Sequence, residues 1–463
     1  MLSYMRSHNR CRLQKLLALY FQFKGVSAKG FDTLHAMGLT MSHKWTAVSV
    51  GRISKACMAE VQQQLDISPW LMSHDNVNIP FRVFSQRLDN QGEFGNGTAA
   101  TIYVKPGATP LLPNANSRLK LQRAEGMQNT LTELDIMDLG HESYPEIRNH
   151  AIYHVLRFLL ESPEFNLKKY SGKRSKVFNP PTPIRKVKGG PEHRTLQYLL
   201  GTVNIPEASY EDNGRLVDEW MTQMGWGGKD AQKSVGTEKV IFWVGDQLTV
   251  DRLRNLAKYR AEDENSYARL DFGVFLYGWF HLQMAFANSL HKQYGGTQKT
   301  RGLQHAFLLL QKKGLTTVQT KGVFHHNLED AIYHVAEAHI REDWEELAGV
   351  DDLSELRKRT PEELYALATR IVDERASSEA IDKMMAKPNS QQDHELKQII
   401  LWNRDVLQYI TLDYAIKSGD IATMEGMLPH LLYRFIGGGN SKYMVEVLEL
   451  LQALHRELPA DVA

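Results

Sequence analysis

The apolar run Lys239–Val244, with the sequence KVIFWV, constrains the fold more than any other segment of the chain. A continuous apolar stretch of this length predicts a strand that is buried on both faces, as in the centre of a parallel sheet. Gly245-Asp246 ends the run, and the pattern then predicts a helix over Leu248–Tyr259, a buried strand over Phe272–Tyr277 and a helix over His281–His291. This order indicates parallel strands joined by right-handed crossovers.

Three shorter candidate strands precede this unit. Trp70–Asp75, Ile79–Leu88 and Thr98–Val104 are rich in apolar and β-branched residues, and turn-forming residues at Asn76-Val77-Asn78 and Asp89–Gly97 separate them. Consecutive short strands of this kind predict an antiparallel meander.

Helical patterns fill most of the remaining chain. Residues 1–66 predict three helices, the third capped by Ser42, and their short turns suit either a helix-turn-helix unit or a plain helical hairpin. Residues 301–432 are helical and acidic, with 16 Asp/Glu against seven Lys/Arg between Glu329 and Lys383. After Gly437-Gly438-Gly439, a last helix begins at Asn440 or Ser441 and runs to about Arg456.

Together these patterns predict an α/β chain with a ribonuclease-H-like mixed sheet that is split by insertions, and with a large, mostly α-helical remainder. The expected segments are an N-terminal helical region (1–67), the meander (68–110), a helical insertion (111–237), the second part of the sheet (238–295), an acidic helical insertion (296–436) and a C-terminal helix (437–463).

Composition narrows the class of protein. The 463 residues include 55 Lys+Arg and 54 Asp+Glu, and a hydrophobic share of 42% excludes wholesale disorder. Two cysteines, Cys11 and Cys57, are too few for a disulfide scaffold or a cysteine-rich zinc module. Neither a signal peptide nor a membrane span is indicated. We therefore expect an intracellular protein without a membrane partner, nuclear if it acts on DNA.

The near-zero net charge conceals one strongly basic segment. Between Lys168 and Arg194 there are nine Lys/Arg and one acid, together with four prolines, which predicts an exposed loop. Such a loop would neutralise DNA phosphates. The side chains expected to do so are Lys173, Arg174, Lys176, Arg185, Lys186 and Lys188.

Acidic residues stand at the positions where a ribonuclease-H-like core places its catalytic carboxylates. Asp75 ends the first predicted strand, Asp246 follows the buried strand, and the last helix offers Glu446 or, as the alternative, Glu449. In such cores carboxylates from different elements hold two divalent ions, here Mg²⁺ or Mn²⁺. Each position also has a plain structural alternative: Asp75 as a turn former, Asp246 as a helix cap, and the two glutamates on a solvated helix face.

Histidines supply one further candidate. His281, in Gly278-Trp279-Phe280-His281, is expected either to position a substrate phosphate or to be a hydrogen-bonded histidine at a helix start. His334 and His339 are five residues apart, which excludes the helical His-Glu-x-x-His pattern of zinc hydrolases.

Several of these segments resemble an uncharacterised fungal family, the domain-of-unknown-function family 6589, which is multi-copy in mushroom-forming fungi. The resemblance covers nearly the whole chain and implies no established activity. The segments that carry it are Asp75-Asn76-Val77-Asn78, 245–252 (GDQLTVDR), 260–267 (RAEDENSY), 278–281 (GWFH), 287–294 (ANSLHKQY), 336–340 (AEAHI) and 437–443 (GGGNSKY).

A second resemblance is to ribonuclease-H-like transposases, in which the second Asp is followed by a strand, a Cys/Asp-x-x-His element, a helical insertion and a final Glu. Asp246, His281 and Glu446 follow that order, with Gly278 where those enzymes carry Cys or Asp. The resemblance implies a transposase-derived protein that cleaves or joins DNA. The alternative is a non-catalytic, domesticated scaffold or DNA-associated protein. The N-terminal helices are expected to contact DNA or to mediate homo-oligomerisation.

Overall fold

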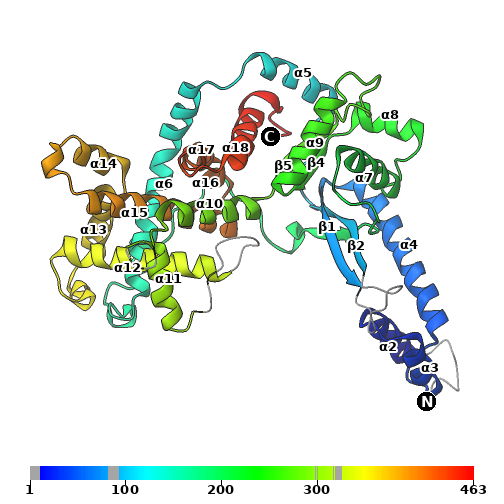
Figure 1. Cartoon of the computed structure of the whole chain (residues 1–463), viewed down its shortest axis with the longest axis horizontal. Coiled ribbons are helices and arrows are strands. Elements are labelled where there is room, and N and C mark those ends of the chain that lie inside the picture. The colour runs from blue at the N-terminus through cyan, green and yellow to red at the C-terminus, as the bar shows by residue number, and fades with distance from the viewer. Residues whose placement is uncertain (1–10, 82–92, 298, 300, 316–317, 319–325) are drawn as a thin grey trace. The chain divides into compact units, whose positions relative to one another are not determined.

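The computed structural model describes residues 11–81, 93–297, 299, 301–315, 318 and 326–463. It divides into two compact units, each made of several stretches of chain (Figure 1). Unit 1 comprises Met1–Leu111, Gly190–Trp243 and Arg252–Val274, and unit 2 comprises Leu112–Gly189, Val244–Asp251 and Phe275–Ala463.

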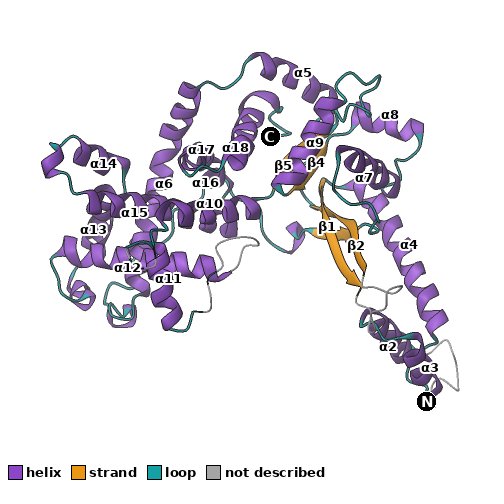
Figure 2. Cartoon of the chain, in the orientation of Figure 1, coloured by secondary structure: helices purple, strands orange, loops and turns teal. Residues whose placement is uncertain are grey.

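The strands form one small sheet, and the rest of the described chain is helical or loop (Figure 2). The five strands lie in the order β3-β2-β1-β4-β5. β1 pairs antiparallel with β2, from Trp70 opposite Val104 to Phe81 opposite Glu93, and β2 pairs antiparallel with β3. The strands are β1 (Trp70–Phe81), β2 (Glu93–Val104), β3 (Leu196–Leu199), β4 (Ile241–Gly245) and β5 (Gly273–Tyr277).

β4 and β5 run parallel, as the sequence predicts. The backbone N–H of Ile241 donates to Phe272 O at 2.8 Å, and that of Gly278 donates to Gly245 O at 2.9 Å, so the pairing advances in the same direction on both strands. Helix α9 (Gln247–Tyr259) makes the crossover between them. The sheet is therefore mixed, which confirms that part of the predicted fold class.

The predicted meander is wrong in its connections. Asn76-Val77-Asn78 does not turn, because β1 continues through it to Phe81. The polar side chain of Asn76 is instead satisfied by Glu207, whose backbone N–H it accepts at 3.1 Å and whose carboxylate it contacts at 3.3 Å. The third antiparallel strand is β3, far along the chain. The predicted turn at Asp89–Gly97 is wrong over residues 93–97, which belong to β2, and residues 89–92 lie outside the described residues, as does most of the predicted strand Ile79–Leu88.

Unit 1 packs helices against its strands. Ser42 accepts the backbone N–H of Trp45 at 3.2 Å and caps the third N-terminal helix, as predicted. Met72, Ile102, Trp220, Trp243 and Phe272 are fully buried in its core. The helices are α2 (Arg12–Phe23), α3 (Ala28–Ala36), α4 (His43–Ile67), α7 (Tyr210–Gln223) and α8 (Lys229–Glu238), with the 3-10 turn η4 (Pro191–His193).

Unit 2 is a helical assembly, in agreement with the helical pattern predicted for residues 301–432. Its α-helices are α5 (Ala115–Gln128), α6 (Glu133–Glu161), α10 (Trp279–Tyr294), α11 (Leu303–Lys312), α12 (His326–Ala348), α13 (Pro361–Arg375), α14 (Ser378–Met385), α15 (His394–Ser418), α16 (Ile421–Gly426), α17 (Leu428–Gly437) and α18 (Ser441–Gln452). Shorter turns are η2 (Leu167–Lys169), η3 (Lys176–Phe178), η5 (Leu353–Lys358), η6 (Asn389–Gln391) and the π-turn η7 (Ala453–Glu457).

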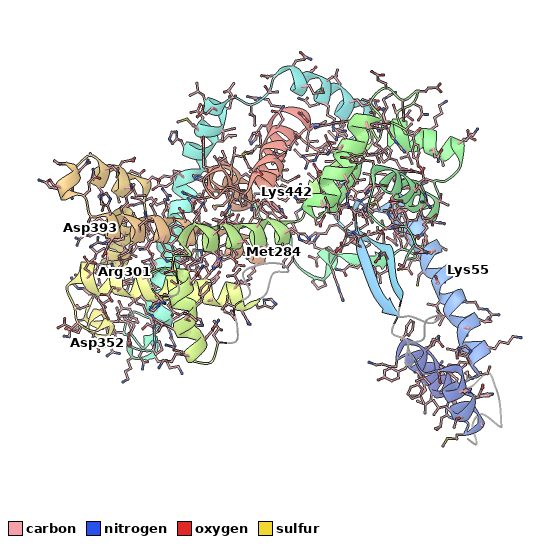
Figure 3. The ribbon with its side chains drawn as sticks, viewed as in Figure 1. Lys55, Met284, Arg301, Asp352, Asp393 and Lys442 are labelled. Carbon is pink, nitrogen blue, oxygen red and sulfur yellow. The ribbon has the colours of Figure 1, made fainter. Side chains whose placement is uncertain are left out.

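Helix α15 runs through the core of unit 2 and buries residues on all sides, from Ile400 to Ala415. Asp393, labelled in Figure 3, begins the helix by accepting the backbone N–H groups of Glu395 and Leu396 at 3.0 and 2.9 Å. Gly419 ends the helix with φ +71°, a conformation that favours glycine. None of the described helices is both long and apolar enough to cross a bilayer.

Candidate functional site

The turn from β4 into α9 positions Asp246. A side chain on Gly245 would bring its Cβ within 2.6 Å of Thr249 Cγ2, so the tight turn requires glycine. Asp246 Oδ1 accepts the backbone N–H of Thr249 at 2.7 Å, which caps α9. The capping alternative for Asp246 is therefore correct, and it holds the carboxylate at the end of the strand.

Glu446 lies on the buried side of α18 and is 2% exposed. The alternative of a solvated helix face is therefore wrong for Glu446, because the face that packs carries Glu446, Val447 and Leu451, while Leu448 is 38% exposed. Glu449 is exposed. Of the two predicted alternatives for the third acid, the structure thus buries Glu446 and leaves Glu449 at the surface.

Asp246 and Glu446 come together beside Tyr443. Burial first, and then the negative charges of Asp246 and Glu446, raise the pKa of the Tyr443 hydroxyl above its ordinary value. Gln247 Nε2 donates to Glu446 Oε1 at 3.4 Å. The β4–α9 turn and α18 are thus joined by the Gln247–Glu446 contact, and the charges of Asp246 and Glu446 both act on the Tyr443 hydroxyl.

His281 lies in the first turn of α10, as its helix-start alternative predicts. Its backbone N–H donates to Gly278 O at 3.1 Å, and Gly278 N–H donates in turn to Gly245 O, which joins the ends of β5 and β4. A Cβ on Gly278 would meet His281 Cδ2 at 3.5 Å, an ordinary contact. The glycine that departs from the transposase pattern is therefore not imposed by packing.

Asp75 belongs to unit 1, whereas Asp246, His281, Glu446 and Glu449 belong to unit 2. It is exposed in the middle of β1, opposite Ala99, and its Oδ1 accepts the N–H of Asn76 at 2.7 Å. Asp75 is therefore a strand residue and does not form a turn.

A buried polar group beside Asp75 was missed from the sequence. His74, on the opposite side of β1, accepts the indole N–H of Trp243 at its Nδ1 at 2.9 Å, and its Nε2 lies 3.8 Å from Glu207 Oε1. Arg252 also pairs with Glu207, at 3.7 Å. Strand alternation places His74 on the same side as the fully buried Met72, which is the signal that could have revealed it.

The arrangement of acidic and histidine side chains bears on metal binding. Among the described residues, no group of three or more His, Cys, Asp or Glu side chains is arranged to hold one. Asp246 and Glu446 supply carboxylate oxygens, the type of ligand that Mg²⁺ prefers together with water and phosphate oxygens.

The basic loop is exposed and partly anchored within unit 2. Lys186 bridges to Asp420 through the backbone, and Ile421 N–H donates to Arg185 O. The Arg185 guanidinium pairs with Glu425, so its charge is already neutralised. Lys173 Nζ donates to Lys168 O at 2.8 Å. The exposed members of the predicted set with no ion pair among the described residues are Lys173, Arg174, Lys176, Lys186 and Lys188.

Fold and site together define a mixed α/β chain with a small sheet, a large helical part and a pair of carboxylates at a strand end. The model of a family of unknown function, DUF6589, matches residues 126–463, and the chain belongs to this family. The matched span contains Asp246, His281 and Glu446 but not Asp75. No curated protein and no solved structure matches the chain.

Proposed function

We propose that the chain is a transposase-derived protein of fungal origin with a ribonuclease-H-like core, and that Asp246 and Glu446 bind Mg²⁺ or Mn²⁺ for DNA cleavage or strand transfer. One observation carries the proposal: two acids from distant parts of the chain converge on Tyr443. A cation bound near both carboxylates would be attracted by two negative charges.

The sheet supports the same proposal. A ribonuclease-H-like core needs three antiparallel strands followed by a parallel strand–helix–strand unit, and β1–β3 and β4–α9–β5 occur in that order. It also needs an acid directly after the fourth strand and another on a late helix, where Asp246 and Glu446 stand.

The residues of the site have distinct roles in this proposal. A bound ion would supply an activated oxygen nucleophile and neutralise charge on the phosphodiester. Thr249 N–H holds Asp246 in place, and Gln247 holds Glu446. Tyr443, kept protonated by its raised pKa, is a hydrogen-bond donor at neutral pH.

The test is nicking of supercoiled plasmid by the purified full-length chain with Mg²⁺ or Mn²⁺. Asp246→Asn and Glu446→Gln keep the side-chain shapes and remove the charges, and we expect each to lower the rate about 100-fold or more. Mn²⁺ binding, followed by the paramagnetic resonance signal of the free ion, is expected to weaken in both variants.

Glu449→Gln is the matched control, because it removes an exposed carboxylate three residues further along the same helix. It is expected to retain both activity and Mn²⁺ binding. Asp75→Asn tests the third predicted carboxylate separately. Equal nicking by the wild type and Asp246→Asn would remove Asp246 from the reaction.

DNA binding is tested by its dependence on salt. Replacing Lys186 or Lys188 by Ser is expected to weaken DNA binding and to reduce the slope of log K against log salt by about 1 for each phosphate that the variant no longer neutralises. Arg185→Gln is the control, because its charge is already paired with Glu425, and we expect a smaller change. Equal effects at all three positions would contradict this assignment. Nuclear localisation is part of the same proposal.

A non-catalytic scaffold is the second candidate. It is favoured by the capping role of Asp246, since a carboxylate that accepts a backbone N–H has a sufficient structural reason to be there. Exposed apolar side chains on α2, such as Leu16 and Phe23, would suit homo-oligomerisation. This candidate predicts DNA binding without metal-dependent nicking and without Mn²⁺ binding at Asp246 and Glu446.

A further inference from the structure

Unit 2 contains a cavity of about 370 Å³, lined by residues of α6, α13, α14, α15 and α17. This volume lies in the range of small-molecule sites. It is distinct from the Asp246–Glu446 site, since none of the residues of that site lines it.

Two arginines on one wall of the cavity share a single counter-charge. Asp405, which is 2% exposed, accepts Arg404 Nε at 2.8 Å and Arg434 Nη1 at 2.9 Å, and it also accepts the hydroxyl of Tyr294 at 2.6 Å. At this wall, one carboxylate between two guanidinium groups leaves one positive charge uncompensated, while the lining carboxylates Glu133 and Glu379 come from α6 and α14. Among the described residues, no acceptor is found for Nη2 of either arginine.

Further hydrogen-bond donors lie beside these arginines on α15. Gln408 uses its Oε1 to accept Arg434 Nε at 2.9 Å, which leaves its Nε2 as a donor. Thr411 is fully buried, lines the cavity, and its hydroxyl has no hydrogen-bond partner among the described residues. Arg404, Gln408 and Thr411 follow a spacing of four and three residues, so they share one face of the helix.

Of the other ionisable side chains in the lining, Arg148 and His430 add no net positive charge, whereas Glu133 and Glu379 are carboxylates on α6 and α14. Arg148 makes two bonds to Asp373, at 2.7 and 2.6 Å. Burial, and then the charge of Arg434, lower the pKa of His430 to about 4, so it is neutral at physiological pH. Glu379 accepts the Tyr144 hydroxyl at 3.3 Å. The apolar part of the wall includes Met137, Ile147 and Leu407.

We propose that this cavity binds a small organic anion, with its carboxylate or phosphate at Arg404, Arg434, Gln408 and Thr411 and its apolar body against the remaining wall. The surplus of donors and the uncompensated guanidinium charge at this wall select an acceptor-rich, negatively charged head group. The apolar wall selects against inorganic anions. This inference does not depend on the proposed DNA chemistry.

The test is calorimetric titration of the full-length chain with octanoate, octyl phosphate and the uncharged octanol. We expect saturable binding of at least one of the two anions, about tenfold or more tighter than octanol because octanol lacks the charge. The tighter of the two anions identifies the head group.

Two variants test the location. Gly140 lines the cavity, and a Cβ there meets only Pro429, at 3.7 Å, so Gly140→Leu fills the space from a helical position. It is expected to abolish binding without loss of fold. Arg404→Gln is expected to weaken anion binding about tenfold, whereas Arg148→Gln, whose bonds all go to Asp373, is expected to leave it unchanged.

Thermal melting of each variant shows whether it is folded, so that loss of binding can be told apart from loss of fold. Thr411→Val, which removes one hydroxyl at constant shape, replaces Arg404→Gln if that variant does not fold. Absence of saturable binding by both anions, equal binding of octanol, or full binding by folded Gly140→Leu would overturn the proposal.

Discussion

Two buried carboxylates in unit 2 have opposite surroundings. Asp405 lies between the guanidinium groups of Arg404 and Arg434 and accepts a third bond from Tyr294. Glu446 is buried to the same degree, 2% exposed, but the neighbours that define its site are the Gln247 amide and the charge of Asp246. Asp405 is surrounded by positive charge, and Glu446 stands beside negative charge.

The difference separates structural roles from functional ones. Burial of a carboxylate costs several kcal/mol, and paired cations offset that cost at Asp405. At Glu446 the charge of Asp246 adds a second negative charge to the surroundings. Two nearby acids are a candidate for ion binding, whereas the acid between two arginines organises the wall of the anion cavity.

The largest expected effect on stability is at Asp405. Asp405→Asn leaves Arg404 and Arg434 facing each other without a counter-charge, and we expect it to lower the free energy of unfolding by about 3–5 kcal/mol. Glu446→Gln removes one of two like charges and is expected to change it by less than about 1 kcal/mol. Urea midpoints followed by circular dichroism measure both. Similar losses in the two variants would remove the contrast between the sites.

A smaller effect is expected in the pH dependence of the free energy of unfolding, through His430, which lines the cavity. The pKa of His430 in the folded protein is about 4, below its ordinary value of 6.5, mainly because of burial. The unfolded chain therefore takes up the proton first, so the stability contribution is present above pH 6.5 and is lost as pH falls toward 4. We compare the free energy of unfolding of His430→Gln with that of the wild type at each pH. The difference is expected to shift in favour of the variant by about 3 kcal/mol between pH 7 and pH 4.

Urea titrations of the wild type and His430→Gln at both pH values give this difference directly. Because other groups titrate in the same window, only the change between the two proteins is used. An identical pH dependence in both would show that His430 does not stay neutral in the folded protein.

The smallest expected effect concerns the helix that carries Arg404 and Asp405. Asp393→Ala removes the acceptor of two backbone N–H groups at the start of α15 and is expected to cost about 1 kcal/mol. Asp352→Ala is the matched control. It also removes a capping carboxylate, which accepts one backbone N–H, but at the short turn η5 and not at α15. Mn²⁺ binding is expected to be unchanged in both, and its loss in Asp393→Ala would couple α15 to the acid pair.

The elements with strong local signals were predictable from the sequence. The run Lys239–Val244 covers β4 except for its last residue, Gly245, and the helices on either side of β5 begin and end within a few residues of their predicted bounds. Ser42 caps α4 as predicted because capping depends only on neighbouring residues. Asp246 was located for the same reason, since it directly follows a buried strand.

What depends on distant partners was not predictable. Asn76 has the composition of a turn, but Glu207, far along the chain, lets it remain in a strand. The helical period of α18 suited a solvated position for Glu446, but the residue is buried. The period of a helix does not specify which neighbours cover it. The cavity could not be predicted from the sequence for a similar reason. Arg404 and Arg434 belong to different helices, and only packing brings both to Asp405.

The late position of β3 has a consequence for synthesis on the ribosome. Leu196 follows Val104 by 92 residues, so the outer edge of β2 has no strand beside it until that length of chain has been made. At ordinary rates of translation this takes roughly 5–20 s. An open strand edge is a template for pairing with other chains. The nascent protein therefore passes through a period in which we expect chaperones to be needed and crowded polysomes to favour aggregation.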